Sequence, residues 1–340
     1  MNIKKDQTSA IKNVSSDQIE ILPVENVSDV INMQAGVVQG HFRGGRNTEV
    51  TYLIDGIKVD EGFSSEGQAV ALEPDAVSEI EVIIGTFNAE YGKAMSGVVN
   101  QITKSGTNNF EGSTSFSYAN YLTPNSDIFP GINQFSLNRN QDYRLQIGGP
   151  ILRDKLFFFL NYKMGSYNNH LNAFNYFSPS DQSDYSSDNP NEWVSENSGD
   201  SSLVAMNTSK NSSLMGKLKF VINNKWKTSF LFTNNIGEWH PYDHAFRYNP
   251  NGVAYSSSET SFYAFQSNYM LSNSIFFDIK YSNLRYSNGY FVYEDATDSR
   301  YVNDIFLQSR PGFFTGGQEK AHSNRPVSYT HLTLPTNREV

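Results

Sequence analysis

Apolar and polar residues alternate with period two in the part of the chain that follows residue 110. In segment 156–164 one set of alternate positions is apolar throughout, whereas the other set ends in Asn161 and Lys163. Successive side chains of a β-strand point to opposite faces, so this alternation predicts strands with one apolar face. The same pattern predicts seven strands, at 111–120, 143–149, 156–165, 212–222, 227–236, 261–271 and 275–286.

The links between these strands alternate in length. Segments 152–155, 223–225 and 272–274 are tight, whereas 121–142, 167–211 and 237–260 are long and polar. Outer-membrane β-barrels sort their links in this way, with short periplasmic turns and long extracellular loops, and strands of about 9–11 residues cross a bilayer when tilted. The pattern therefore favours a membrane barrel over a soluble β-protein.

The first hundred residues follow a different pattern, in which short extended runs alternate with helical turns. Apolar spacing in 19–33 predicts a helix over 29–34, capped by Ser28 and stopped by Gly36. A further helical turn is expected at 74–79, and extended segments are expected at 49–54, 80–84 and 97–104. These elements indicate a small separate domain that mixes helices and strands.

Composition narrows the classes of function. The 340 residues include no Cys, and 26 Lys and Arg against 35 Asp and Glu give a net charge of −9. The lack of Cys excludes disulfides and Cys-ligated metals, and the acidic balance argues against nucleic-acid binding. The mean hydropathy is −0.50, and no apolar run is long enough to predict a transmembrane helix.

Five sequence blocks occur in order before residue 107. They are His-Phe-Arg-Gly-Gly-Arg at 41–46, Tyr-Leu-Ile-Asp-Gly-Ile at 52–57, Ala-Val-Ser-Glu-Ile-Glu-Val-Ile at 76–83, Phe-Asn-Ala-Glu-Tyr-Gly at 87–92 and Ser-Gly-Val-Val-Asn-Gln-Ile-Thr-Lys-Ser-Gly at 96–106. Together they resemble the plug domain of TonB-dependent outer-membrane receptors, in the subfamily that carries a carboxypeptidase-regulatory-like β-sandwich ahead of the plug. Segment 148–159 resembles an early barrel hairpin of the same family.

The resemblance implies an α+β plug domain at 1–109, followed at 110–326 by antiparallel transmembrane β-barrel strands. About seven of about 22 strands would be present, so the barrel would be incomplete. The implied function is energised uptake of a siderophore, cobalamin, glycan or peptide into the periplasm of a Gram-negative bacterium, without enzymatic chemistry, cofactor or metal. The implied partners are the TonB–ExbB–ExbD complex, reached through a segment missing here, outer-membrane lipid, a surface lipoprotein and the ligand.

The two ends of the chain carry expectations of their own. Segment 327–340 resembles a translated sequencing adapter, so we expect it to be an assembly artefact; an ordinary loop is the alternative. The first residues are polar and contain no signal peptide. We therefore expect the gene product, which the family places in the outer membrane, to be longer on both sides.

The plug blocks supply candidate structural and gating residues. Gly44 and Gly45 permit a positive φ and a close backbone approach, and Asp55-Gly56 indicates a turn. Arg43 and Arg46 are forked donors whose candidate partners in a buried ion network are three glutamates of the same blocks, with ordinary surface ion pairs as the alternative. The full set is Arg43, Gly44, Gly45, Arg46, Asp55, Gly56, Glu79, Glu81, Glu90, Tyr91, Gly92 and Gly97.

Loops 63–68, 167–211 and 237–260 are expected to face the substrate. Phe63 lies in the first of them, and Trp193, Trp239 and Tyr242 in the other two are candidates to stack on a sugar or an aromatic ligand. Anchoring at the lipid headgroups is the alternative role for these aromatic residues. Both roles stay open at the level of sequence.

Neither a metal site nor an enzyme motif stands out. Asp188 and Glu192 lie in an acidic loop free of Lys and Arg and are candidate Ca²⁺ ligands, although a solvated loop is the simpler explanation. His240 and His244 have the spacing of a helical zinc pair, but Pro241 excludes a helix there. The competing classes are an outer-membrane binding or adhesion protein without transport and a soluble, β-rich secreted enzyme.

Overall fold

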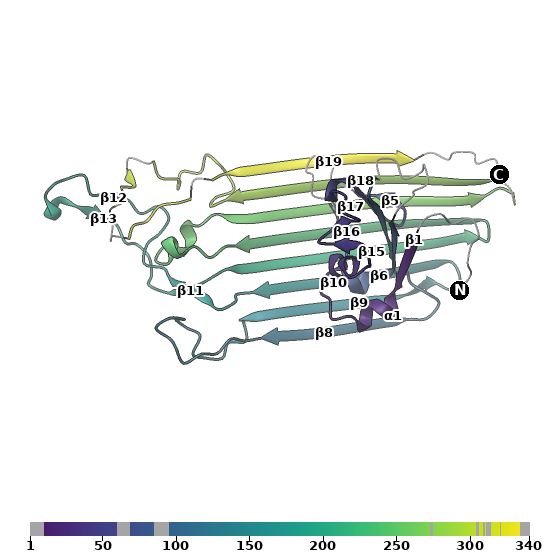
Figure 1. Cartoon of the computed structure of the whole chain (residues 1–340), viewed down its shortest axis with the longest axis horizontal. Helices are drawn as coiled ribbons and strands as arrows, with labels where there is room; N and C mark the ends of the chain where they lie inside the picture. The colour runs from purple at the N-terminus through teal and green to yellow at the C-terminus, as the bar shows by residue number, and fades with distance from the viewer. Residues whose placement is uncertain are drawn as a thin grey trace.

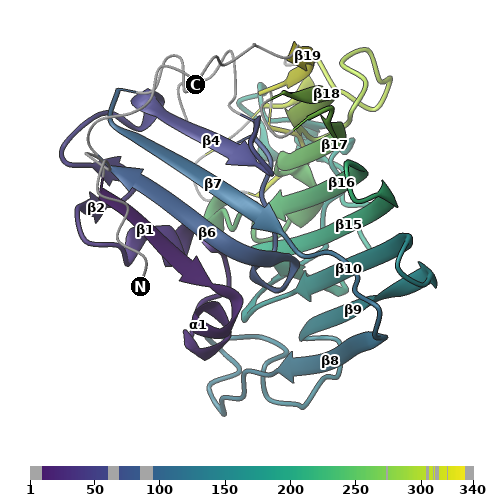
Figure 2. The ribbon, with the colours of Figure 1, turned by 90° about the vertical axis from the view of Figure 1, so that its right-hand side faces the viewer.

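The computed structural model describes residues 10–59, 69–84, 95–272, 275–303, 306–308, 310, 314–319 and 321–333. Two sheets dominate these residues, one of five strands and one of eight. We call residues 10–104 the N-terminal domain, and the eight-stranded sheet the long sheet. Figure 2 shows the N-terminal domain standing against one face of the long sheet.

The N-terminal domain is built on a mixed sheet in the order β1-β6-β7-β4-β5, with bounds β1 (Ala10–Ser15), β4 (Val50–Ile54), β5 (Ile57–Lys58), β6 (Val77–Ile84) and β7 (Gly97–Thr103). Strands β4 and β7 are parallel, and the other neighbours are antiparallel. The remaining elements are α1 (Ser16–Ile21), α2 (Val27–Asn32), β2 (Val37–Val38), β3 (His41–Phe42), η1 (Asn47–Glu49) and η2 (Pro74–Ala76). The three extended segments expected in this region are thus strands β4, β6 and β7.

The predicted bounds of the second helix were wrong. Helix α2 begins at Val27 rather than at residue 29, and Asn26 rather than Ser28 is its N-cap residue. The earlier start turns Val27 into the core beside Val30 and Ile31, and Asn26 is as suitable an N-cap residue as Ser28, so the burial of one more apolar side chain favours this start. The turn at 74–79 is likewise shorter than expected, because β6 begins at Val77.

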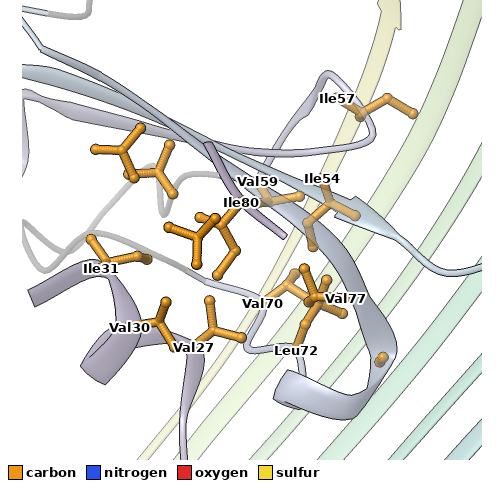
Figure 3. Close-up of a cluster of buried hydrophobic side chains, with 14 of the residues drawn as sticks. Val27, Val30, Ile31, Ile54, Ile57, Val59, Val70, Leu72, Val77 and Ile80 are labelled. Atoms are coloured by element: carbon orange, nitrogen blue, oxygen red, sulfur yellow. The ribbon is translucent and has the colours of Figure 1, made fainter. Parts of the chain in front are cut away.

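Branched aliphatic side chains fill the space between α2, the segment before β6 and the mixed sheet. Figure 3 shows them converging from these elements. Val30, Ile54, Val70, Val77 and Ile80 are completely buried. The cluster extends into the long sheet and includes six of its side chains: Phe159, Met215, Leu231, Phe262, Ala264 and Leu284. The two sheets therefore share one hydrophobic core, and the burial of this apolar surface holds them together.

The long sheet has the strand order β19-β18-β17-β16-β15-β10-β9-β8, and every neighbouring pair is antiparallel. The bounds are β8 (Glu111–Ala119), β9 (Asn140–Leu152), β10 (Leu156–Tyr167), β15 (Thr208–Asn223), β16 (Trp226–His240), β17 (Tyr255–Met270), β18 (Phe276–Phe291) and β19 (Ser323–Thr333). Each of the seven predicted strands overlaps one of these elements.

The eighth strand was not predicted. Strand β19 pairs with β18 from Ser323 to Thr333 and so includes part of segment 327–340, which had been set aside as an artefact. The count of seven strands is therefore corrected to eight for the described part of the sheet. The pairing says nothing about the origin of the segment, which stays a prediction.

The period-two pattern separates the two faces of the long sheet. On β10, Phe157, Phe159, Asn161 and Lys163 are buried against the N-terminal domain, whereas Met164 is exposed on the opposite face. We call the face that contacts the N-terminal domain the inner face, and the opposite one the outer face. Exposed aromatic and aliphatic side chains, among them Leu218, Phe220, Phe230 and Phe265, line the outer face.

The links are sorted between the two ends of the long sheet, as expected. Figure 1 shows long loops leaving one end and tight turns closing the other. The loops contain β11 (Leu171–Phe174), β12 (Ser183–Asp184), β13 (Val194–Ser195), β14 (Leu203–Met206), η3 (Pro190–Glu192), η4 (His244–Phe246) and η5 (Pro250–Gly252). Among the described residues no helix has the length and apolar character needed to cross a membrane.

Candidate functional site

The β4–β5 hairpin ends in a two-residue turn that contacts the long sheet. Asp55 and Gly56 connect the paired residues Ile54 and Ile57, and both have left-handed backbones, with φ of 50° and 73°. An Asp-Gly pair suits this turn because both residues tolerate positive φ. The predicted turn is thus confirmed, and its position brings the Asp55 carboxylate to the inner face of the long sheet.

Asp55 bridges the two sheets. Its Oδ1 accepts a hydrogen bond from the Thr103 backbone N–H at 2.9 Å, and its Oδ2 accepts one from the Thr103 hydroxyl at 2.7 Å. The ammonium group of Lys217, on β15, lies 2.9 Å from the same Oδ2 and 2.7 Å from the Thr103 hydroxyl oxygen. The side chains of Lys217 and Asp55 are only 9% and 14% exposed, so this is a buried, charge-assisted contact.

A second lysine reaches the same turn. Lys280 on β18 donates to the Gly56 carbonyl oxygen at 3.3 Å. The Gly56 N–H donates to the Asn100 side-chain oxygen at 3.0 Å, and the Asn100 amide donates to Glu81 at 2.8 Å. Glu81 therefore supports the hairpin from within the N-terminal domain.

The segment before β6 makes further polar contacts with the long sheet. Lys163 on β10 pairs with Glu73 at 2.9 Å, and Arg144 on β9 pairs with Asp75 at 3.5 Å. The Asn235 amide on β16 donates to the Ala71 carbonyl at 2.8 Å. We call Arg144, Lys163, Lys217 and Lys280 the interface cations, since each joins the inner face to the N-terminal domain.

This arrangement suits a separable contact between two bodies. A buried ion pair gains little net stability when it forms, but removing one partner leaves the other charge buried. When the two domains separate, both charged side chains of each pair lose their partners at the same time. The surrounding apolar contacts have no directional preference, so the cations fix the register of one sheet on the other. The site offers positional control of the N-terminal domain rather than covalent chemistry.

The predicted Arg–Glu network is wrong where the structure describes its members. Arg43 and Arg46 are exposed, and neither forms an ion pair with Glu79 or Glu81 within the described residues. The Arg46 backbone N–H instead donates to Glu49 at 3.1 Å. The physical reason is that both arginines sit in an exposed turn, where water solvates the guanidinium groups. Glu90, Tyr91 and Gly92 lie outside the described residues.

The first and last sequence blocks approach each other closely at their glycines. A Cβ added to Gly45 would lie 2.4 Å from the Ser96 Cβ, and one added to Gly97 would lie 2.5 Å from the Phe42 ring. Gly44 has a φ of 78° but open space around it. Gly45 and Gly97 are therefore needed for close approach, whereas Gly44 is needed for its backbone angle.

Sequence reasoning missed the interface cations. The sequence shows Lys163 only as the end of one set of alternate positions, and the acceptors of Lys163 and Lys280 lie 90 and 224 residues away in the chain. A lysine on the inner face of a strand looks the same in sequence whether it meets water or a carboxylate. The available signal was a charged residue on the same face as large apolar ones, as Lys163 is with Phe157 and Phe159.

The long loops pack into one unit at the end of the sheet opposite the tight turns. Backbone N–H groups of Phe174 and Phe177 donate to the Arg247 and Tyr248 carbonyls at 2.9 Å each. The Asn249 amide donates to the Gly317 carbonyl at 2.8 Å, so the loop after β18 joins the same unit. We call residues 168–207, 241–254 and the described part of 292–322 the loop cap.

The candidate aromatic residues occupy three settings. Tyr242 packs on Ala173, Met206 and Val253 inside the loop cap. The Trp193 indole N–H donates to the Ser187 carbonyl at 2.8 Å. Trp239 is 49% exposed, and the alternation along β16 puts it on the inner face, where lipid does not reach. The substrate-facing role of these residues stays a prediction, and Phe63 lies outside the described residues.

The acidic loop contains no preformed cation site in the part that the structure describes. No group of three or more His, Asp and Glu side chains gathers around one point there. Glu192 accepts hydrogen bonds from the Ser187 hydroxyl at 2.6 Å and the Asn189 amide at 3.2 Å, which lower its pKa. Asp188 lies exposed on the same loop. Ca²⁺ binding by this pair therefore stays a prediction without geometric support.

Two family models match successive parts of the chain. The TonB-dependent receptor plug domain matches residues 3–99, and an outer membrane beta barrel domain matches residues 102–188. The chain is 28% identical over 202 residues to the TonB-dependent transporter Oar of Myxococcus xanthus, which covers 56% of this chain and 18% of that protein. The match thus extends over a small part of that relative.

Solved structures share the fold. The siderophore receptor PirA from Acinetobacter baumannii gives a TM-score of 0.60 at 15% identity, covering 95% of this chain and 44% of that one. The outer membrane transporter YddB from Escherichia coli gives 0.61 at 14% identity, covering 94% and 44%. The chain spans less than half the length of these structures. The two domain matches, over residues 3–99 and 102–188, make the chain similar in sequence to the TonB-dependent receptors of the outer membrane, and the solved structures share its fold.

Proposed function

We propose that the chain is part of a receptor that imports a nutrient into the periplasm, energised by the TonB–ExbB–ExbD complex. A siderophore, cobalamin, a glycan or a peptide fits the family, and PirA is named as a siderophore receptor. The loop cap and Trp239 would receive the ligand, and further strands outside this chain would complete the barrel. A surface lipoprotein is an additional proposed partner.

The interface cations carry this proposal. Force applied through TonB has to separate or remodel the N-terminal domain within the barrel, so the polar contacts between them must break and re-form. The Lys217–Asp55 contact, at 2.9 Å, joins β15 directly to the turn of the β4–β5 hairpin. In the proposed mechanism it holds the closed state and opens with each uptake cycle.

A reversible cross-link tests the mechanism. The chain has no Cys, so Asp55→Cys with Lys217→Cys introduces the only thiols in these 340 residues. A short bifunctional methanethiosulfonate reagent should join the two positions in the intact receptor and stop uptake in cells supplied with the nutrient. A reductant should then restore uptake, because it cleaves the bridge.

The matched control carries Lys217→Cys with Lys219→Cys, two residues apart on the same face of β15, so that a bridge forms there without joining the two bodies. We expect uptake by this variant to be unaffected by the reagent. Normal uptake with the Asp55–Lys217 bridge intact would rule out separation at this contact. An outer-membrane binding protein without transport would instead bind nutrient at the surface and show no uptake in any variant.

A further inference from the structure

A shallow apolar hollow lies on the outer face of the long sheet, on the side away from the N-terminal domain. Its volume is about 340 Å³, and its lining is almost wholly apolar: Leu152, Leu156, Leu218, Phe220, Phe230 and Phe265, with Thr228 at its floor and Ser229 bordering it. Five strands contribute side chains to it: β9, β10, β15, β16 and β17.

Small residues create the hollow. Phe220 pairs with Thr228, which in turn pairs with Ser267, whereas the neighbouring row joins Leu218, Phe230 and Phe265. These pairs share the outer face because directly opposed residues of antiparallel strands point the same way. A row with two hydroxyl residues beside a row of bulky ones leaves room for a slender apolar chain.

The hollow lies close to the tight turns. Leu152 and Leu156 flank the β9–β10 turn, and Phe220 and Thr228 stand three or four residues from the β15–β16 turn. At about 3.3 Å per residue, this is roughly 10 Å from the end of the sheet. Since tight turns mark the periplasmic end of an outer-membrane barrel, the hollow faces the acyl chains of the periplasmic leaflet.

Basic side chains stand at the rim of the hollow. Arg153 and Lys155 lie in the β9–β10 turn, and Lys225 lies in the β15–β16 turn; all three are exposed. Within the described residues none of the three forms an ion pair, and the one carboxylate between them, Asp154, accepts a hydrogen bond from Asn108 at 2.6 Å. The rim therefore keeps a net positive charge at headgroup depth.

Aromatic residues mark the same depth. The Trp226 ring packs edge-on against Tyr269 at 5.8 Å, and its N–H donates to the Ser267 hydroxyl at 3.0 Å. Trp and Tyr concentrate where hydrocarbon meets headgroups. The membrane–water boundary therefore lies beside Trp226. The apolar hollow is on the hydrocarbon side of this boundary, and the three basic residues of the rim are on the aqueous side.

We propose that this hollow and its rim form a binding site for an anionic glycerophospholipid of the periplasmic leaflet. One acyl chain lies between Phe220 and Phe230 over Thr228, and the phosphate lies near Lys155 and Lys225. The site requires only that the long sheet spans the outer membrane. The proposed lipid site does not depend on whether the receptor transports a nutrient.

Photochemical labelling in vesicles tests the site. The intact receptor is placed in phosphatidylcholine vesicles that contain a small fraction of either phosphatidylglycerol or phosphatidylcholine bearing a diazirine on one acyl chain. We expect peptides from β15 and β16 around the hollow to receive at least about fivefold more label from phosphatidylglycerol, since each basic residue near an anionic headgroup contributes about that factor. The labelled residues are located by mass spectrometry.

Two variants test the basic rim and the apolar hollow separately. Lys155→Gln with Lys225→Gln should reduce the ratio of the two lipids to about one, since the electrostatic preference depends on these charges. Thr228→Phe should reduce labelling of the hollow by both lipids, because it fills the floor. The matched controls are Lys210→Gln on β15 and Ile236→Phe on β16, both exposed residues outside the hollow, and we expect no change from them.

Three results would overturn the proposal. Equal labelling by the two lipids would exclude a specific contact with the phosphate. Label spread along the outer face in proportion to exposed area would show that the hollow is not a preferred site for the acyl chain. Label concentrated at the end of the sheet that carries the long loops would indicate lipid of the other leaflet. The lysine variants lie in exposed turns, so they keep the test decisive if Thr228→Phe fails to fold.

Discussion

Asp55 differs from a surface carboxylate because its side chain is only 14% exposed and, among the residues that the structure describes, Lys217 is the only cation that pairs with it. Replacing Lys217 with Gln leaves the carboxylate buried with two hydrogen bonds from Thr103 and no counter-charge. We expect this variant to lower the free energy of local opening of the N-terminal domain by about 2–3 kcal/mol. Hydrogen–deuterium exchange of β4 and β7 in the intact receptor measures the change.

Two further variants control this measurement. Asp55→Asn together with Lys217→Gln removes both charges, so the pair should lose less stability than Lys217→Gln alone. Lys210→Gln lies exposed on the same strand and should change stability by less than about 0.5 kcal/mol. If Lys217→Gln were as mild as Lys210→Gln, the contact would not hold the domain.

Individual residues were the least predictable level. The sequence indicated the Asp55-Gly56 turn correctly, because a two-residue turn with positive φ depends on local chemistry alone. It paired Arg43 and Arg46 with the wrong partners and did not connect Lys217 with Asp55, which is 162 residues away. Which charges meet depends on how the two sheets dock, and they dock through an apolar core whose members lie far apart in the chain.

At the level of elements, β7 and the β2–β3 hairpin pack at backbone distance. A Cβ at Gly97 would lie 2.5 and 2.7 Å from two atoms of the buried Phe42 ring. We expect Gly97→Ala to lower stability by about 1–3 kcal/mol, because the ring has no free space to move into. The measurement is the temperature at which the N-terminal domain of the intact receptor loses its protection against protease.

Gly216→Ala is the matched control, since Gly216 also lies in a strand and a Cβ there would meet nothing within 4 Å. Its effect should stay within about 0.5 kcal/mol. Equal effects of the two substitutions would show that loss of strand glycine, rather than close packing at Phe42, determines the outcome.

Seven strands of the long sheet were predictable, whereas β19 and the lengths of the strands were not. The alternation located the seven strands because one face of each is apolar. Strand β17, however, begins at Tyr255 rather than at residue 261, and its first part reads Ser-Ser-Ser-Glu-Thr. This part extends towards the loop cap, where neither face has to be apolar, so only pairing with β16 and β18 reveals it.

At the scale of the whole molecule, the described sheet has two open edges, β8 and β19. All nine residues of β8 are exposed, and half of the backbone groups of an edge strand point away from the sheet. In hydrocarbon each unpaired backbone group costs several kcal/mol, so an open sheet of this size is unstable in a bilayer. The long sheet therefore needs partners for both edges in a bilayer, and we expect these to be further strands from outside these 340 residues.

We accordingly expect residues 1–340 alone, refolded in detergent, to give no heat-modifiable, protease-resistant band in gel electrophoresis. The intact receptor prepared in the same way should give one, because a closed barrel resists detergent until it is boiled. A resistant band from the 340-residue chain would mean that β8 and β19 find partners within the chain or in a second copy. In that case the interface cations would hold the N-terminal domain inside a smaller barrel, and the need for outside strands would be withdrawn.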